Sequence, residues 1–369
     1  MYSFNGYKVA ILHYSNSIID LNKPFGMQRM ELGELKVLRE AGVIATLYAK
    51  EVIGNHPQLK AIPYLETDKL LLDIPFYQRF LDSNTNADIY QGNATPLLAL
   101  FKPEKTIIRF DGVVPLPLVD IKGVKDQYAK ASYIFVSKSI KNYYLKNYPF
   151  LNPEKCHVLY NAVDSFPIQT RKKINNFRIL FCSRWSYEKG IDLLIKSLKF
   201  LQRIHNNYEL IVAGGMQKTS SADAKGSARE EKIKETLRSF KNVKVLGFVP
   251  HDELMKLYSE VDLLLFPSIY PEPFGLIAAE AAVACVPTCA YSVGAIPEVV
   301  KHKETGVLMP FSDKNIINVI RLVKTLSFCI RNRNMLDDMG VAARKRVISN
   351  FNWENYRRDL FHIYSSICK

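Results

Sequence analysis

Short apolar segments alternate with amphipathic segments along most of the chain, and no other feature of the sequence constrains the fold as strongly. In the first half the predicted strands are 9–12, 44–48, 89–90, 106–110, 133–136 and 157–159, and a helix is predicted over 27–41. In the second half the predicted strands are 177–182, 208–213, 243–246, 261–266 and 286–290, and helices are predicted over 191–203, 252–259 and 275–284. Strands that alternate with helices form βαβ units, so the expected fold class is α/β with parallel sheets.

A polar and basic segment at 166–176 interrupts this alternation and is interpreted as a linker. We therefore expect two doubly wound, Rossmann-like domains, at 1–165 and 177–349, followed by a last segment at 350–369. The length of 369 residues also favours two domains, because a single hydrophobic core rarely grows beyond about 300 residues. Residues 217–230, rich in Ser, Ala, Lys and Gly, are predicted to form a mobile loop.

The composition excludes several classes of protein. With 48% hydrophobic and 23% charged residues the chain is neither disordered nor collagen-like. It contains no apolar run of the roughly 18 residues that a membrane-spanning helix needs, and its first residues lack the pattern of a secretory signal. The six cysteines have neither metal-ligand nor disulfide spacing, so we expect reduced thiols, no metal site and a cytoplasmic location.

The formal net charge of +14 favours anionic partners: nucleotide phosphates, an acidic membrane surface or nucleic acid. Most of this excess lies in the second half of the chain. No segment combines clustered bases with interleaved aromatic residues, so nucleic acid is not expected as a partner. Lys138, Lys141 and Lys146 form a candidate basic patch in the first domain, and a solvated helix face is the alternative.

The segment 271–280 is the richest in chemical groups. Prolines fix the backbone on both sides of Glu272, and Gly275 permits a close approach where a helix begins. The unpaired amides at that helix start suit a phosphate or a polar sugar face. Glu280 lies within an apolar helix, so it is either held by a backbone group or an arginine, or it accepts hydrogen bonds from ribose hydroxyls. Glu272 taken alone is equally compatible with a solvated loop acid.

Two cations, Arg184 and Lys189, follow the predicted strand 177–182. A planar guanidinium and a mobile ammonium are a suitable pair for a diphosphate leaving group, and two ordinary surface cations are the alternative. Gly214, after the strand 208–213, either lets the backbone approach a ligand or simply forms a turn.

The order of these motifs resembles that of retaining, nucleotide-sugar-dependent glycosyltransferases of family 4, which have the GT-B architecture. The resemblance is carried by Glu272 and Glu280, with Pro273-Phe274-Gly275-Leu276 between them, and by Arg184 with Lys189-Gly190. Weaker matches are Gly214-Gly215, Gly247-Phe248-Val249, Pro267-Ser268, Gly294 with Pro297-Glu298, Asn161-Ala162-Val163-Asp164 and Phe351-Asn352-Trp353.

This resemblance implies two domains that face each other across a cleft, with 350–369 as a helix that crosses back to the first, acceptor-side domain. It also implies metal-independent transfer of a hexose from a nucleotide diphosphate sugar, the co-substrate, without a further cofactor. The acceptor would be a glycan or a lipid-linked glycan of cell-surface polysaccharide or lipopolysaccharide synthesis. The enzyme would work in the cytoplasm, with peripheral contact to the anionic inner face of the plasma membrane as an option.

The resemblance also assigns roles to residues. Glu280 would hold the donor ribose, and Arg184 with Lys189 the diphosphate. Glu272, Phe274, Gly275 and Leu276 would face the transferred sugar, while Gly26, Gly214 and Val249 would contribute further donor contacts, the last through its backbone. Asp111 stands where the family commonly has a histidine, so Glu272 and Asp111 are the predicted catalytic residues.

Three alternatives remain open from the sequence. His13 is another candidate for the histidine role, against a histidine packed in the core. Sugar-nucleotide 2-epimerases share the two-domain architecture, although no acid/base pattern of theirs is evident here. Charge alone would also suit a nucleic-acid-binding protein.

Overall fold

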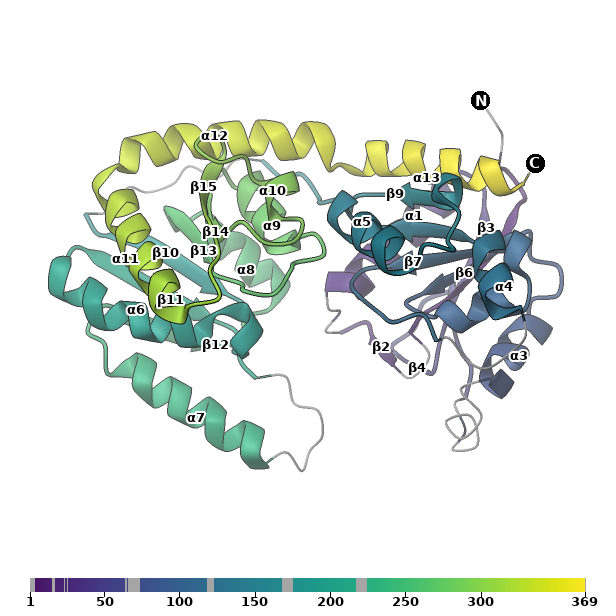
Figure 1. Ribbon diagram of the computed structural model, residues 1–369, viewed down its shortest axis with the longest axis horizontal. Coiled ribbons are helices and arrows are strands. Elements are labelled where there is room, and N and C mark those ends of the chain that lie inside the picture. The colour runs from purple at the N-terminus through teal and green to yellow at the C-terminus, as the bar shows by residue number, and fades with distance from the viewer. Residues whose placement is uncertain are drawn as a thin grey trace. The chain divides into compact units, whose positions relative to one another are not determined.

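The computed structural model (Figure 1) describes residues 4–14, 17–22, 24, 26–63, 65, 74–117, 123–167, 175–216 and 224–368. The chain divides into two compact units. Unit 1 comprises Met1–Ala162 together with Trp353–Lys369, and unit 2 comprises Val163–Asn352.

Unit 1 is built on a seven-stranded sheet with the strand order β5-β3-β1-β6-β7-β8-β9, in which all pairings are parallel. The strands are β1 (Lys8–Leu12), β3 (Ile44–Ala49), β5 (Leu59–Ala61), β6 (Ile89–Asn93), β7 (Thr106–Phe110), β8 (Ser132–Phe135) and β9 (Cys156–Val158). A separate short pair joins β2 (Ile18–Asp20) and β4 (Glu51–Ile53). The helices are α1 (Gly26–Glu40), α3 (Ile74–Asp82), α4 (Val124–Lys130), α5 (Lys138–Asn147) and α13 (Trp353–Ile367).

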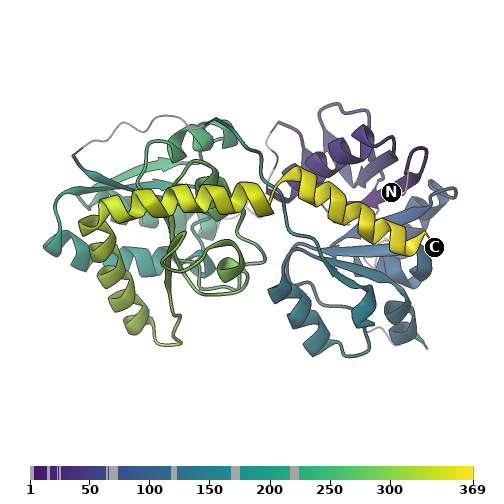
Figure 2. The ribbon, with the colours of Figure 1, turned by 90° about the horizontal axis from the view of Figure 1, so that it is seen from above.

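The central strands of unit 1 are buried on both faces, as helix-covered parallel sheets require. Aromatic rings fill much of the core, and the rings of Phe110 and Tyr144 stack with their centroids 4.3 Å apart. Figure 2 shows helix α13 running along this unit, where the ring of Phe361 stacks on Phe4 at 5.1 Å. A Cβ atom on Gly33 of α1 would lie 2.1 Å from the Trp353 ring, so only glycine permits this approach of α13.

Unit 2 has a six-stranded parallel sheet with the order β12-β11-β10-β13-β14-β15. Its strands are β10 (Phe177–Cys182), β11 (Tyr208–Ala213), β12 (Val243–Gly247), β13 (Leu263–Phe266), β14 (Thr288–Tyr291) and β15 (Gly306–Met309). Its helices are α6 (Ile191–Ile204), α7 (Ala224–Arg238), α8 (His251–Tyr258), α9 (Leu276–Val283), α10 (Ile296–Val299), α11 (Asn315–Arg331) and α12 (Arg333–Asn350). Two parallel-sheet, Rossmann-like units are therefore confirmed.

One local prediction is wrong. The expected mobile loop at 217–230 is helical from Ala224 onward, because α7 begins there. Its sequence is rich in Ala, Lys, Arg and Glu, which are good helix formers, and its residues Ile233 and Leu237 are buried in the unit 2 core. The remainder of that loop, 217–223, lies outside the described residues, as does 168–174 of the expected linker. Within the described part of the chain, no helix is both long enough and apolar enough to cross a membrane.

Candidate active site

The sequence-predicted residues of unit 2 lie at one edge of its sheet. Arg184 and Lys189 follow β10, Gly214 follows β11, Val249 follows β12, and the segment 272–280 follows β13. These four strands are neighbours in a parallel sheet, so their carboxyl ends meet at the same edge. Ligands of open α/β sheets bind at this edge, where loops and helix starts converge.

Lys189 and Glu272 form an ion pair that the sequence did not predict. Lys189 Nζ lies 2.5 Å from Glu272 Oε1, and Ser268 Oγ donates to the same oxygen at 2.5 Å. Glu272 is only 5% exposed, so the alternative of a solvated loop acid is wrong. The lysine offsets the cost of burying this carboxylate.

Backbone hydrogen bonds and a close backbone approach hold together the two loops that carry this pair. The carbonyl of Glu188 accepts hydrogen bonds from the amide of Ile269 at 2.9 Å and from the amide of Tyr270 at 3.3 Å. Gly190 has a φ of +79°, and a Cβ atom there would lie 2.0 Å from the Pro267 carbonyl oxygen. The loops 183–190 and 267–275 therefore form one framework, which fixes Lys189 relative to Glu272.

Arg184 is more open than Lys189. Its side chain is about half exposed, and its guanidinium lies 4.0 Å from the Glu188 carboxylate. Partial burial tends to raise the pKa of Glu188, but hydrogen bonds and the cations Arg184 and Lys189 lower it overall. An exposed guanidinium next to the buried pair is accessible to an anionic ligand.

Helix α9 begins at a conformation that glycine favours. Gly275 caps it with a φ of +96°, and Leu276, its first residue, is half-buried. Phe274 packs its ring against Phe351 with centroids 5.3 Å apart and is 2% exposed. Because that ring is fixed in the interior, the side chain of Phe274 is not available to a ligand.

Gly294 supports the same segment from the loop after β14. Its φ is +56°, and a Cβ atom there would lie 2.4 Å from the backbone of Glu272. The amide of Ala295 donates to the Glu272 carbonyl at 2.8 Å. The loop after β14 therefore also holds the backbone of Glu272 in place.

Glu280 lies on α9 and is 7% exposed. The sequence alternatives for its partner were a backbone group or an arginine, but the structure places the His251 Nε2 atom 3.2 Å from Glu280 Oε1. Sequence reasoning missed His251, although its position at the start of α8, directly after the Gly247–Pro250 segment, was a usable signal. The nearby thiol of Cys182 is unreactive at neutral pH, because burial raises its pKa to about 12.

Unit 1 holds its own predicted residues. Gly26 begins α1, and Asp111 follows β7. The Arg109 Nε atom donates to Asp111 at 3.1 Å, so the predicted catalytic carboxylate already has a cationic partner. Although burial lowers the pKa of Arg109, its partners Asp111, Tyr356 and Glu34 raise it well above the ordinary value.

Arg109 joins α13 to the sheet of unit 1. Its Nη1 atom donates to Glu34 Oε2 at 2.9 Å and to the hydroxyl of Tyr356, and its Nη2 atom donates to Asn161 Oδ1 at 2.7 Å. The Tyr356 hydroxyl also donates to Glu34. Arg109, Glu34, Tyr356 and Asn161 are buried and Asp111 is largely buried, so this is an internal polar network that sequence reasoning missed.

His13 belongs to the interior of the same unit. It is 1% exposed, and its Nδ1 atom lies 2.7 Å from Glu31 Oε1. Asn93 donates to the same carboxylate oxygen at 2.6 Å. The alternative of a packed histidine is confirmed.

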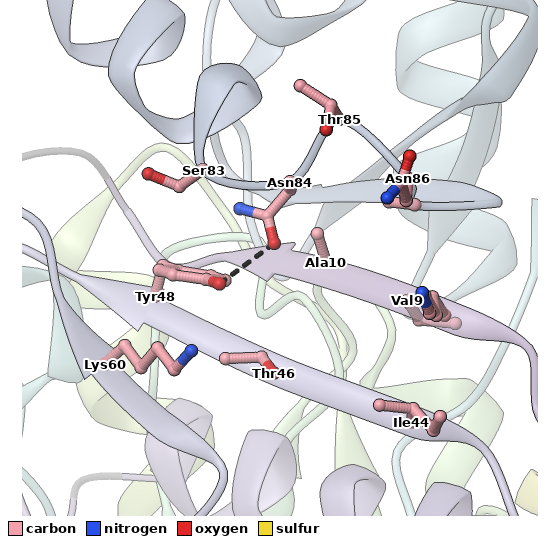
Figure 3. Close-up of a pocket in the computed structure, with 12 residues that line it drawn as sticks. Val9, Ala10, Ile44, Thr46, Tyr48, Lys60, Ser83, Asn84, Thr85 and Asn86 are labelled. Atoms are coloured by element: carbon pink, nitrogen blue, oxygen red, sulfur yellow. Dashed lines mark hydrogen bonds between the residues drawn. The ribbon is translucent and has the colours of Figure 1, made fainter.

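A cavity of about 270 Å³ in unit 1 lies elsewhere (Figure 3). It is lined by the first residues of β1, by one face of β3 and by the loop 83–87, with Tyr48 donating to Asn84 at 2.9 Å. None of the predicted site residues lines it. Among the residues that the structure describes, no group of three or more His, Cys, Asp or Glu side chains could hold a metal ion.

Comparison with known proteins points to one family. Residues 164–346 match the family described as "Glycosyl transferases group 1". An uncharacterized glycosyltransferase of Methanocaldococcus jannaschii is 32% identical over 257 residues, which is 64% of this chain and 60% of that protein. The matched segments cover about half to two thirds of the length of the first curated relatives.

Solved structures share the whole fold. Sucrose-phosphate synthase from Thermosynechococcus elongatus has a TM-score of 0.76 at 20% identity, over 98% of this chain and 99% of that one. The Anabaena protein HepE, solved in complex with UDP-glucose, has a TM-score of 0.70 at 17% identity, over 97% and 99%. The predicted GT-B fold class, with two Rossmann-like domains, is thereby confirmed.

Proposed function

We propose that the protein is a retaining hexosyltransferase that uses a nucleoside diphosphate sugar, because residues 164–346 match the family described as "Glycosyl transferases group 1". The observation that carries the proposal is the set of charges at one sheet edge of unit 2. The exposed Arg184 and the Lys189–Glu272 pair lie on the loops after β10 and β13, and the buried Glu280 lies on α9, the helix that follows. The UDP-glucose bound by HepE, a protein of the same fold, supports this donor class.

The charges suit the departure of a nucleoside diphosphate. As the anomeric bond breaks, negative charge grows on the diphosphate, and Arg184, Lys189 and the amides at the start of α9 are placed to stabilise it. The ammonium of Lys189 has three donors, so it can contact phosphate while it still pairs with Glu272. The sugar becomes positively charged in the same step, and the Glu272 carboxylate can stabilise that charge.

Retention of configuration would follow if the leaving phosphate helps to deprotonate the acceptor on the same face of the sugar. Glu280 would accept hydrogen bonds from the ribose hydroxyls, because a carboxylate offers about four acceptor positions. Asp111 and Gly26 of unit 1 remain predicted contributors. The hydrogen bond from Arg109 holds Asp111 in a fixed orientation, so its proposed role is to accept a sugar hydroxyl.

For the acceptor we propose a glycan or a lipid-linked glycan of surface polysaccharide synthesis, used in the cytoplasm. Lys138, Lys141 and Lys146 on α5 are the proposed contact with an anionic membrane. Binding of the protein to vesicles with and without anionic lipid tests that contact. Equal binding to the two kinds of vesicle would contradict it.

Donor binding should stabilise the folded protein. A saturating donor is expected to raise the melting temperature by about 5 °C, since a ligand at 100 times its Kd adds about 2.7 kcal/mol. A thermal-shift screen of UDP-, GDP- and ADP-glucose identifies the base. Glu280→Gln should abolish most of the shift, whereas Glu235→Gln, at an exposed position of α7, should not change it.

The outcome that contradicts the proposal is a protein that none of the three donors stabilises. Incubation with UDP-GlcNAc in the absence of acceptor separates transfer from isomerisation. Accumulation of its 2-epimer would identify a sugar-nucleotide epimerase instead.

We expect the reaction not to depend on a divalent metal, because Arg184, Lys189 and the helix start would offer the diphosphate positive charge. Release of nucleoside diphosphate from the donor should proceed at an unchanged rate after dialysis against EDTA. A rate that falls at least tenfold and returns with Mg²⁺ or Mn²⁺ would show that a metal is required.

A further inference from the structure

His251 stands between two parts of the donor site of unit 2. It is the first residue of α8 and follows directly on Val249 and Pro250, the segment after β12. From there its imidazole reaches α9, which packs against α8, and contacts Glu280, 29 positions further along the chain. One side chain therefore connects the segment of Val249, which is proposed to contact the donor through its backbone, to the carboxylate proposed to hold the ribose.

The geometry defines the role of each atom. The Glu280 side chain is 9% exposed and that of His251 is 32% exposed, so the contact lies at the boundary between interior and surface. An ionised carboxylate can only accept hydrogen bonds, so His251 Nε2 must carry the proton at the observed distance of 3.2 Å. The Nδ1 atom faces the other way, 3.9 Å from the exposed carboxylate of Asp252.

The Cys182 thiol also lies near Glu280: burial raises the pKa of this thiol most, and the Glu280 carboxylate adds to the rise. The Tyr258 hydroxyl lies 3.5 Å from the same thiol. A hydrogen bond donated by a ring nitrogen fixes the plane of a carboxylate. A carboxylate that must accept two vicinal hydroxyls gains most from such a fixed plane.

We infer that His251 is a positioning residue that orients the Glu280 carboxylate toward the ribose hydroxyls of the donor, and this inference rests on the proposed function. Its effect should then depend on the presence of those hydroxyls. Loss of the histidine should weaken a ribonucleotide, whereas a nucleotide without the 2′-hydroxyl should be affected much less.

The test is calorimetric titration of the full-length protein with UDP, GDP and ADP and with their 2′-deoxy counterparts. For the diphosphate that binds, His251→Ala should raise the Kd about tenfold or more, as expected for one hydrogen bond to a charged group. The Kd of the 2′-deoxy form should change less than twofold. His251→Gln, which retains a donor, should recover part of the preference for ribose.

Two controls separate the possible failures. Glu253→Gln, at an exposed position of the same helix, should leave both Kd values unchanged. If Glu280→Gln keeps the preference for ribose, the proposed donor site fails and the inference fails with it. If Glu280→Gln removes the preference but His251→Ala does not, the inference alone is overturned. Equal weakening of both nucleotides, or tighter ribonucleotide binding in His251→Ala, also overturns it.

Discussion

Lys189→Ala is expected to lower the rate of nucleoside diphosphate release from the donor by about 10²- to 10³-fold, the usual effect of removing one group that stabilises developing negative charge. Lys189 is 15% exposed and held within hydrogen-bond distance of Glu272, so its position is fixed before the donor arrives. The measurement is steady-state release of the diphosphate from the sugar nucleotide that the thermal-shift screen selects. Lys199→Ala, an exposed position on α6, is the matched control and should retain the native rate.

The same substitution also affects a buried carboxylate. Lys189→Ala leaves Glu272 without its cation, so part of the loss could reflect a less stable protein. The double variant Lys189→Met with Glu272→Gln removes both charges and should restore the melting temperature without restoring activity. A double variant that regains near-native turnover would show that the pair is structural and that neither residue serves the reaction.

Arg109→Met is expected to lower the stability of unit 1 by about 3–5 kcal/mol, because it leaves the carboxylates of Glu34 and Asp111 largely buried without their cation. With a urea m-value of about 2 kcal/mol/M, the unfolding midpoint should fall by about 1.5–2.5 M. Arg109→Lys keeps the charge but not the planar guanidinium that contacts four side chains. Its unfolding midpoint should therefore lie between that of the native protein and that of Arg109→Met.

The two tryptophans allow this unfolding to be followed in unit 1. Trp353 belongs to unit 1 and Trp185 to unit 2, so fluorescence in a Trp185→Phe background reports on α13 and its surroundings. Arg358→Met is the control, since that arginine lies on α13 but is 68% exposed and pairs only at the surface. Equal midpoints for Arg109→Met and Arg358→Met would contradict the structural role of the network.

Much of the fold could be predicted from the sequence, because it depends on local periodicity. The predicted strands 106–110, 177–182 and 208–213 agree with β7, β10 and β11 residue by residue. Each is a short apolar run that becomes a strand buried on both faces of a parallel sheet. The wrongly predicted loop in α7 shows the limit of this reasoning, because a polar composition alone does not distinguish an exposed helix from a loop.

Motif spacing along the chain indicates which residues of unit 2 lie at the carboxyl edge of its sheet, because each of these loops begins where a predicted strand ends. The partners of the buried charges follow from packing in three dimensions: Lys189 with Glu272 and His251 with Glu280 in unit 2, and Arg109 with Glu34, Asp111 and Tyr356 in unit 1. A buried charge must be paired with whichever group packing brings close. That group often comes from a distant part of the chain: Tyr356 is 247 positions from Arg109.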